Sequence, residues 1–205
     1  MRGSSHVKRG TACQDCSGFR EAGEWAVAAV SDGHGGDRYF RSDAGSRMAV
    51  KVALDRISES VSSEGFLLSF KEDPDYTVRR IAEDVVSSWR RMVEEHDRFF
   101  PLSAEETESD VQNRGDSLVK YGATLIAAAL GDGFAFGMQV GDGTLACIGL
   151  SGEDSAPVPE DPGCFLNVTT SLCQPVPPVR TWSSEGDQVM AIVLATDGVT
   201  NTFED

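Results

Sequence analysis

The pattern of apolar and polar residues predicts one strand and two long helices in the first half of the chain. Residues 24–31 form a short apolar run that ends at Asp32-Gly33, which indicates a buried strand followed by a turn. Residues 42–62 carry apolar side chains at nearly helical spacing behind a candidate N-cap, Ser42, and predict a helix. Residues 76–99 predict a stronger helix, because their charged side chains lie mostly off the apolar face. The side chains on that face are Ile81, Val85, Trp89, Met92, His96 and Phe99.

The second half of the chain favours strands. Three apolar runs at 123–130, 134–140 and 144–150 are separated by Gly-Asp-Gly turns and predict an antiparallel meander. These runs lack clean polar alternation, so we expect both faces to be covered, by a second sheet or by helices. Another buried strand is predicted at 189–196, ending in Asp197-Gly198.

The connecting segments are predicted to be irregular. Residues 101–117 begin with a proline and are strongly acidic, which favours a solvated loop. Residues 151–180 hold six of the eight prolines, with one short strand predicted at 165–171.

Composition and charge narrow the class of protein. The 205 residues are 40% hydrophobic, enough for one domain with a core. The net charge of −15 disfavours a nucleic-acid partner. No apolar run approaches the roughly 20 residues of a membrane-spanning helix, and no signal peptide is recognised. Together with an odd count of five cysteines, these features predict a cytoplasmic protein that does not bind membranes.

The Cys13–Cys16 pair has the C-x-x-C spacing of metal and redox sites. A zinc site would need a second such pair, which the other cysteines do not form. Asp15 and Ser17-Gly18 suggest a turn here rather than the strand and helix of a redox motif. Metal–thiolate and redox chemistry are therefore disfavoured.

Two predicted strands end in Asp-Gly, at Asp32-Gly33 and Asp197-Gly198. A carboxylate at a strand end is held on a rigid element, and the glycine exposes its carbonyl group. Two such corners brought together would offer the oxygen ligands that Mg²⁺ and Mn²⁺ prefer, with Asp15 as a third carboxylate. Each dipeptide taken alone is also a common turn.

His34 follows the first of these corners and is surrounded by glycines. A histidine beside a pair of cations is well placed to act as a general acid, and the small neighbours would let a substrate approach closely. The alternative is a surface histidine in a flexible loop. His96, on the apolar helix face, is expected to be a packed histidine.

Four stretches in order resemble the metal-dependent protein Ser/Thr phosphatases of the PPM type, or type 2C phosphatases, and are most similar to a bacterial branch. The second stretch is the most specific, because it contains Asp32-Gly33-His34-Gly35-Gly36. The resemblance extends over 1–205 as a single, partial PPM-type phosphatase domain. The four stretches are residues 3–15, 30–36, 122–125 followed by 140–143, and 194–199.

The resemblance implies an α+β fold in which two packed antiparallel β-sheets are flanked by α-helices, an αββα sandwich that is incomplete at the C-terminus. It implies two Mn²⁺ or Mg²⁺ ions, with Asp32 bridging both. The Gly33 carbonyl would bind one ion, Asp197 the other, and Asp15 would bind metal or orient its waters. It also implies that a metal-bridged hydroxide hydrolyses phosphoserine or phosphothreonine in a phosphoprotein while His34 protonates the leaving oxygen.

The sequence departs from the family pattern at several positions. Gln14 stands where the family often has an acidic residue, and Gly143 where it often has serine. Gly10 occupies the spacing of the arginine that binds phosphate, so Arg9 is the replacement candidate, ahead of Lys8. The family's last helices, final strands and a further metal-binding aspartate are expected beyond 205, and part of the first strand before residue 3. The alternative to an active phosphatase is a catalytically silent, phosphatase-like binding or regulatory domain.

Overall fold

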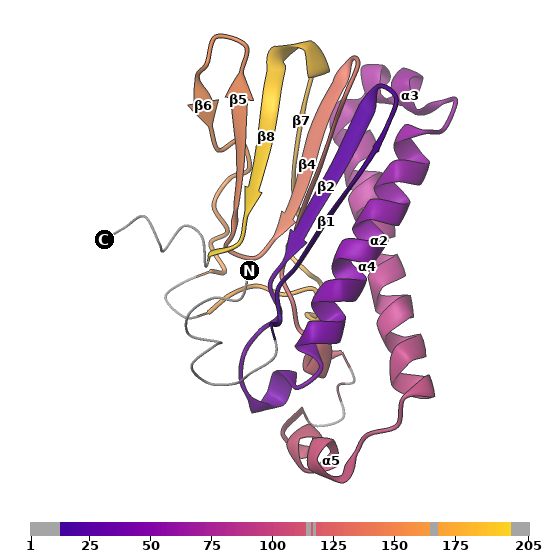
Figure 1. Ribbon diagram of the computed structural model, residues 1–205, viewed down its shortest axis with the longest axis vertical. Coiled ribbons are helices and arrows are strands. Elements are labelled where there is room, and N and C mark those ends of the chain that lie inside the picture. Colours follow the sequence, from indigo (N-terminus) through magenta and orange to yellow (C-terminus); the bar gives the residue numbers. More distant parts are fainter. Residues whose placement is uncertain (1–12, 114–115, 117, 165–167, 198–205) are drawn as a thin grey trace.

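The computed structural model describes residues 13–113, 116, 118–164 and 168–197, arranged in three layers (Figure 1). A five-stranded sheet in the order β1-β2-β3-β4-β7 lies between a three-stranded sheet, β6-β5-β8, and a layer of helices. The predicted α+β fold with two antiparallel sheets is thereby confirmed. The first sheet contains β1 (Cys16–Ala22), β2 (Trp25–Ser31), β3 (Leu125–Gly131), β4 (Phe134–Val140) and β7 (Arg180–Ser184); the second contains β5 (Thr144–Gly149), β6 (Asp154–Ser155) and β8 (Val189–Ala195).

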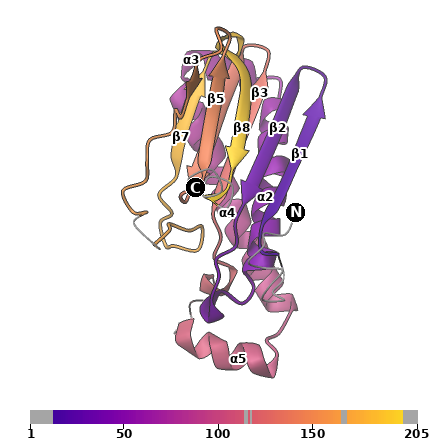
Figure 2. The ribbon, with the colours of Figure 1, turned by 60° about the vertical axis from the view of Figure 1, so that its left-hand side comes forward.

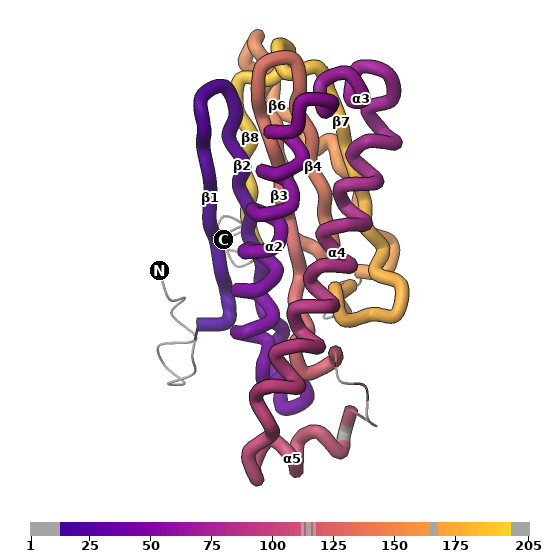
Figure 3. The backbone as a smooth tube through the Cα atoms, turned by 90° about the vertical axis from the view of Figure 1, so that its right-hand side faces the viewer, coloured from indigo at the N-terminus to yellow at the C-terminus, as the bar shows by residue number. Residues whose placement is uncertain are grey.

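Helices α2 (Ser42–Val61) and α4 (Pro74–Phe99) lie side by side across one face of the five-stranded sheet (Figure 3). The short helix α3 (Phe66–Glu72) connects them, and α5 (Ala104–Asp110) lies beyond the end of α4. Short 3₁₀ turns are η1 (Asp37–Tyr39), η2 (Val111–Asn113), η3 (Val119–Tyr121) and η4 (Gly186–Gln188).

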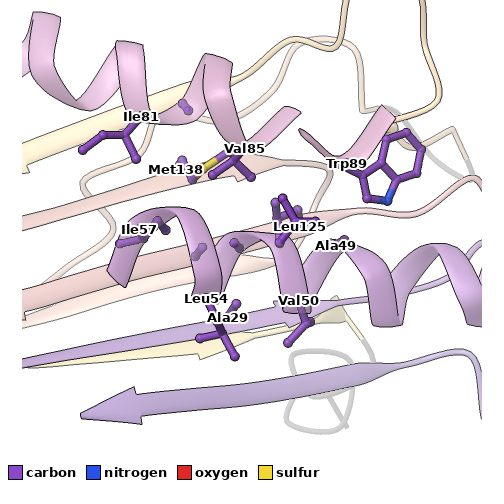
Figure 4. Packing of buried hydrophobic residues seen from close by; sticks show 14 of the residues in the cluster. Ala29, Ala49, Val50, Leu54, Ile57, Ile81, Val85, Trp89, Leu125 and Met138 are labelled. Atoms are coloured by element: carbon purple, nitrogen blue, oxygen red, sulfur yellow. The ribbon is translucent and has the colours of Figure 1, made fainter. Parts of the chain in front are cut away.

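The main core lies between these helices and the five-stranded sheet (Figure 4). Ile57 of α2 and Val85 of α4 are fully buried there, and each such side chain contributes about 1.5–3 kcal/mol of transfer free energy. Trp89 is also fully buried, and its indole Nε1 donates to the Gly45 carbonyl oxygen at 3.0 Å. This hydrogen bond joins α4 to α2 within the apolar layer.

A smaller core separates the two sheets. Ile126 of β3 and Leu145 of β5 are buried in it, and Ile192 and Leu194 of β8 pack against it. The β1–β2 hairpin extends to one side of the second sheet (Figure 2). The strand predicted at 189–196 is present as β8, but it is less buried than predicted, because Val193 is 50% exposed.

The predicted three-strand meander is wrong at its third strand. β3 and β4 form a hairpin with Leu125 opposite Val140, but β5 pairs with β8 and β6 in the other sheet. The chain leaves the first sheet at Gly141, whose φ of 102° is accessible mainly to glycine. Apolar runs and turn signals predict strands, whereas the identity of the partner strand depends on distant contacts.

Both long helices were found at the predicted places, with differences at their ends. Ser42 does not cap α2, since the N-cap residue is Arg41, which makes no side-chain capping bond. α4 begins two residues earlier than predicted, at Pro74, because the Asp73 carboxylate accepts a hydrogen bond from the Tyr76 amide at 2.9 Å. Phe99, predicted on the buried face, is 73% exposed at the helix end.

Three further predictions need correction. The acidic segment 101–117 contains α5, which begins with a capping box between Ser103 and Glu106. Ser17-Gly18 lies in β1 rather than in a turn, where a Cβ on Gly18 would lie 2.9 Å from Leu54 of α2. The strand predicted at 165–171 is absent over 168–171, and its first three residues lie outside the described ranges. Among the described residues, no helix is long and apolar enough to cross a membrane.

Candidate functional site

The site begins at the corner where β2 ends and Asp32 follows. The Asp32 amide donates to the Thr124 hydroxyl oxygen at 3.0 Å, and the Thr124 amide donates to the Asp32 carbonyl at 2.8 Å. The Ser31 hydroxyl donates to the Thr124 carbonyl at 2.5 Å. Because the backbone is bonded to the start of β3 on both sides of Asp32, its carboxyl group projects from a rigid part of the sheet.

Gly33 continues this corner in a confined space. Its amide donates to the Gln14 carbonyl oxygen at 3.1 Å, and it forms an isolated bridge with Ala123. A Cβ at this position would lie 2.7 Å from the Ser42 carbonyl oxygen and 2.9 Å from that of Gln14. Only glycine therefore lets the segment before β1 and the start of α2 approach this closely.

Three aspartates from different parts of the chain meet at this corner. The partly buried Asp32 carboxyl lies within interaction range of Asp15, which precedes β1, and of Asp197, which follows β8. Burial is the main cause that raises the pKa of Asp32 from 3.8 to about 8, and its contacts with Asp15 and then Asp197 contribute to the same shift. The structure thus brings together three of the predicted site residues, which lie next to the ends of strands in both sheets.

The chemistry of this donor set fits hard divalent cations. Mg²⁺ and Mn²⁺ prefer carboxylate and carbonyl oxygens, and a cation would offset both the burial and the carboxylate repulsion that raise the pKa of Asp32. Within the described ranges, no three His, Cys, Asp or Glu side chains already form a ligand group. What the structure shows is that Asp32 contacts Asp15 and Asp197 separately.

His34 is held through its backbone at the edge of the aspartate cluster. Its amide donates to the Gly122 carbonyl oxygen at 3.0 Å, and its carbonyl accepts from Gln14 Nε2 at 3.2 Å. The imidazole packs edge-on against Tyr39, with ring centroids 5.0 Å apart. Burial lowers the pKa of His34, while the negative charge of Asp142 opposes this shift.

Gln14 stands where the family often has an acidic residue, but its hydrogen bonds give it a structural role at the site. Its side-chain amide also donates to the Ser42 hydroxyl at 2.6 Å, and its carbonyl oxygen accepts from the Ser46 hydroxyl at 2.5 Å. Gln14 therefore ties His34 to the first turn of α2. The sequence signal for Gln14 was its position directly before Asp15. Its hydrogen bonds with Ser42 and Ser46 gave no such signal, because α2 is distant in the sequence.

Asp142 is a site residue that the sequence analysis did not assign. It lies in the turn between β4 and β5, where the Thr169 hydroxyl donates to its carboxylate. The neighbouring Gly141 amide donates to the Thr170 hydroxyl oxygen at 3.1 Å, and the Arg180 guanidinium donates to the Gly141 carbonyl. The proline-rich excursion thus returns to fix this turn beside His34. The Gly-Asp-Gly turn signal at 141–143 marked the position without indicating this contact.

Part of the predicted site lies outside the described residues. This applies to Arg9, predicted to bind phosphate, to Gly198, and to positions 3–12 of the first motif. Their predicted roles stay predictions.

The family model described as protein phosphatase 2C matches residues 2–205. This match spans nearly the whole chain, and the chain therefore belongs to the protein phosphatase 2C family of serine/threonine phosphatases, as its motifs predicted. No curated protein matches the sequence.

Solved structures of similar proteins share the fold. A bacterial serine phosphatase superposes with a TM-score of 0.61 at 15% identity, covering 95% of this chain and 76% of that one. The serine/threonine phosphatase of S. agalactiae gives 0.60 at 17%, covering 100% and 78%. The catalytic domain of the serine/threonine phosphatase PstP, solved with two manganese ions, gives 0.53 at 16%, covering 95% and 75%. At these identities the similarity shows the fold alone.

Proposed function

We propose that this protein is a metal-dependent phosphatase that hydrolyses phosphoserine and phosphothreonine in phosphoproteins. The observation that carries the proposal is the partly buried Asp32 carboxyl, which faces both Asp15 and Asp197 two residues before His34. Membership of the protein phosphatase 2C family supports the reaction class. The five cysteines are free thiols, which fits the cytoplasm as the proposed location.

Asp15, Asp32, the Gly33 carbonyl and Asp197 would hold two Mn²⁺ or Mg²⁺ ions. When bound, such ions would lower the pKa of a coordinated water and would neutralise the charge that develops on the phosphoryl oxygens. The two manganese ions in the PstP catalytic domain support this cofactor assignment.

The other side chains of the site position and protonate the substrate. His34 would donate a proton to the seryl or threonyl oxygen as it leaves. Gly35 and Gly36 beside it carry no bulk that would obstruct the phosphorylated residue. Burial lowers the pKa of His34, and the negative charge of Asp142 partly offsets that shift. Arg9 is the proposed contact for the phosphate oxygens.

The proposal is tested by phosphate release from a phosphothreonine peptide and from p-nitrophenyl phosphate. The purified chain is assayed with Mn²⁺, with Mg²⁺, and with a chelator. We expect hydrolysis of both substrates that requires the metal. No hydrolysis with either ion would contradict the proposal and favour a catalytically silent binding domain.

A further inference from the structure

The imidazole of His34 is oriented by packing. Its Nε2 is buried and has no hydrogen-bond partner among the described residues. The two hydrogen bonds of the residue, to Gly122 and from Gln14, use only its backbone amide and carbonyl. A general acid must point at the oxygen that it protonates, so the surfaces that contact the ring determine its direction.

Tyr39 provides one of these surfaces. Its ring meets the His34 ring at an interplanar angle of 66°, a favourable edge-to-face arrangement. The Tyr39 amide donates to the Gly36 carbonyl at 3.0 Å, and the Arg38 guanidinium lies 5.4 Å from the Tyr39 ring centroid. Asn113 Nδ2 donates to the Arg38 carbonyl at 3.0 Å and anchors this turn. Tyr39 is therefore held in place by its own turn and by the hydrogen bond from Asn113 of η2.

Gly122 provides the second surface. A Cβ built on Gly122 would lie 2.8 Å from Tyr39 Cδ1 and 2.9 Å from His34 Cδ2. Both rings therefore pack directly on the bare backbone of Gly122. Its φ of −51° is open to any residue, so glycine is needed here for space and not for backbone conformation.

We propose that Tyr39 and Gly122 are positioning residues that form a seat for the His34 imidazole and direct it toward the leaving oxygen of the substrate. This inference rests on the proposed role of His34 as general acid. It assigns a function to two residues outside the aspartate cluster.

Two substrates with different leaving groups distinguish a loss of His34 positioning from a general loss of activity. The p-nitrophenolate ion is stable and departs without a proton, whereas a threonyl alkoxide must be protonated as it leaves. Misdirecting the general acid should therefore slow the peptide reaction more than the aryl phosphate reaction. The measured quantity is the ratio of kcat for a phosphothreonine peptide to kcat for p-nitrophenyl phosphate.

We expect Tyr39→Ala to lower this ratio at least about tenfold, since small misplacements of catalytic groups have effects of this size or larger. Tyr39→Phe keeps the ring and should restore the ratio. Gly122→Ala should lower it in the same way, because its Cβ displaces both rings. The matched control is Tyr76→Ala, a tyrosine of α4 that is 55% exposed, which should leave the ratio unchanged.

A double-mutant cycle tests whether the effect passes through His34. In a His34→Gln background the general acid is already absent, so adding Tyr39→Ala should not lower the ratio further. A full additional decrease would overturn the proposal. An equal loss on both substrates in Tyr39→Ala would also overturn it, because Tyr39 would then be only structural.

Failure of the proposed function would be recognised separately, as absence of metal-dependent hydrolysis by the unmodified chain. The seat is still testable in that case, by NMR of protein with ¹³C-labelled histidine. His34 ring resonances, assigned with His34→Gln, should shift in Tyr39→Ala and remain in place in Tyr76→Ala. Unchanged His34 resonances in Tyr39→Ala would overturn the proposal that Tyr39 positions the His34 ring.

Discussion

The chemistry of Asp32 at the residue scale is set by its surroundings. Burial and two facing carboxyl groups raise its pKa to about 8, while hydrogen bonds with Thr124 fix its backbone. An isolated aspartate on a surface turn would show neither property. The arrangement stores unfavourable electrostatic energy that a cation would relieve.

Replacing Asp32 by asparagine keeps the shape of the side chain and removes its charge. We expect Asp32→Asn to lower kcat with Mn²⁺ by at least about two orders of magnitude, because a carboxylate that would hold the metal ions is lost. The matched control is Asp132→Asn, since Asp132 also precedes a glycine at a strand end but lies in the exposed β3–β4 turn. Near-normal turnover in Asp32→Asn would refute the role assigned to Asp32.

Removing the imidazole separates acid catalysis from metal binding. His34→Ala should lower the rate of phosphopeptide hydrolysis while the affinity for Mn²⁺, measured by calorimetry, is retained. A large decrease in Mn²⁺ affinity would instead identify His34 as a metal ligand.

At the scale of elements, α5 is attached to the rest of the protein through Arg41, which is only 7% exposed. Arg41 Nε and Nη2 donate to the two carboxylate oxygens of Glu106 at 2.7 and 3.0 Å. Arg41 Nη1 donates to the Phe100 carbonyl at 2.8 Å and to the Tyr121 hydroxyl at 3.0 Å. The start of α2, the end of α4 and α5 are thus joined by one guanidinium group.

The Arg41–Glu106 pair predicts a pH-dependent stability. The hydrogen bond from Arg41 is the main cause that lowers the pKa of Glu106 from 4.5 to about 2. Because the folded-state pKa is below the unfolded-state value, the stabilisation is complete above about 4.5 and is lost as the pH falls toward about 2. Glu106→Gln should lower the free energy of unfolding by ~1–3 kcal/mol at pH 7.

Urea unfolding at several pH values checks this prediction. The difference between the unmodified protein and Glu106→Gln should shrink as the pH falls from about 5 to about 2. Glu105→Gln, an exposed neighbour in α5, should have little effect at any pH. A pH-independent difference for Glu106→Gln would contradict the ion-pair account.

Sequence reasoning located most elements because apolar periodicity is a local property. It found α2, α4, β2, β3 and β4 for that reason. It missed α5, because the acidic residues around the Ser103–Glu106 capping box were interpreted as a solvated loop, and it missed β1, because Gly18 serves packing against Leu54. It also put β5 in the wrong sheet, since an apolar run does not encode its distant partner β8.

On the scale of the whole molecule, the site joins segments that are far apart in sequence. Asp15, Asp32 and Asp197 come from the approach to β1, the end of β2 and the end of β8, so both sheets must pack correctly for them to meet. The Asp-Gly motifs predicted Asp32 and Asp197, and the first motif predicted Asp15. The supporting contacts of Gln14 and Asp142 could not be predicted, because their partners are brought near only by folding.

Calorimetric titration with Mn²⁺ examines whether the carboxyl groups around Asp32 hold divalent cations, on which the proposed reaction depends. The titration compares the unmodified chain, Asp32→Asn and the control Asp132→Asn at one pH and ionic strength. We expect two ions to bind to the unmodified chain and to Asp132→Asn, and this binding to be lost in Asp32→Asn. Absence of binding by the unmodified chain, or undiminished binding by Asp32→Asn, would contradict it.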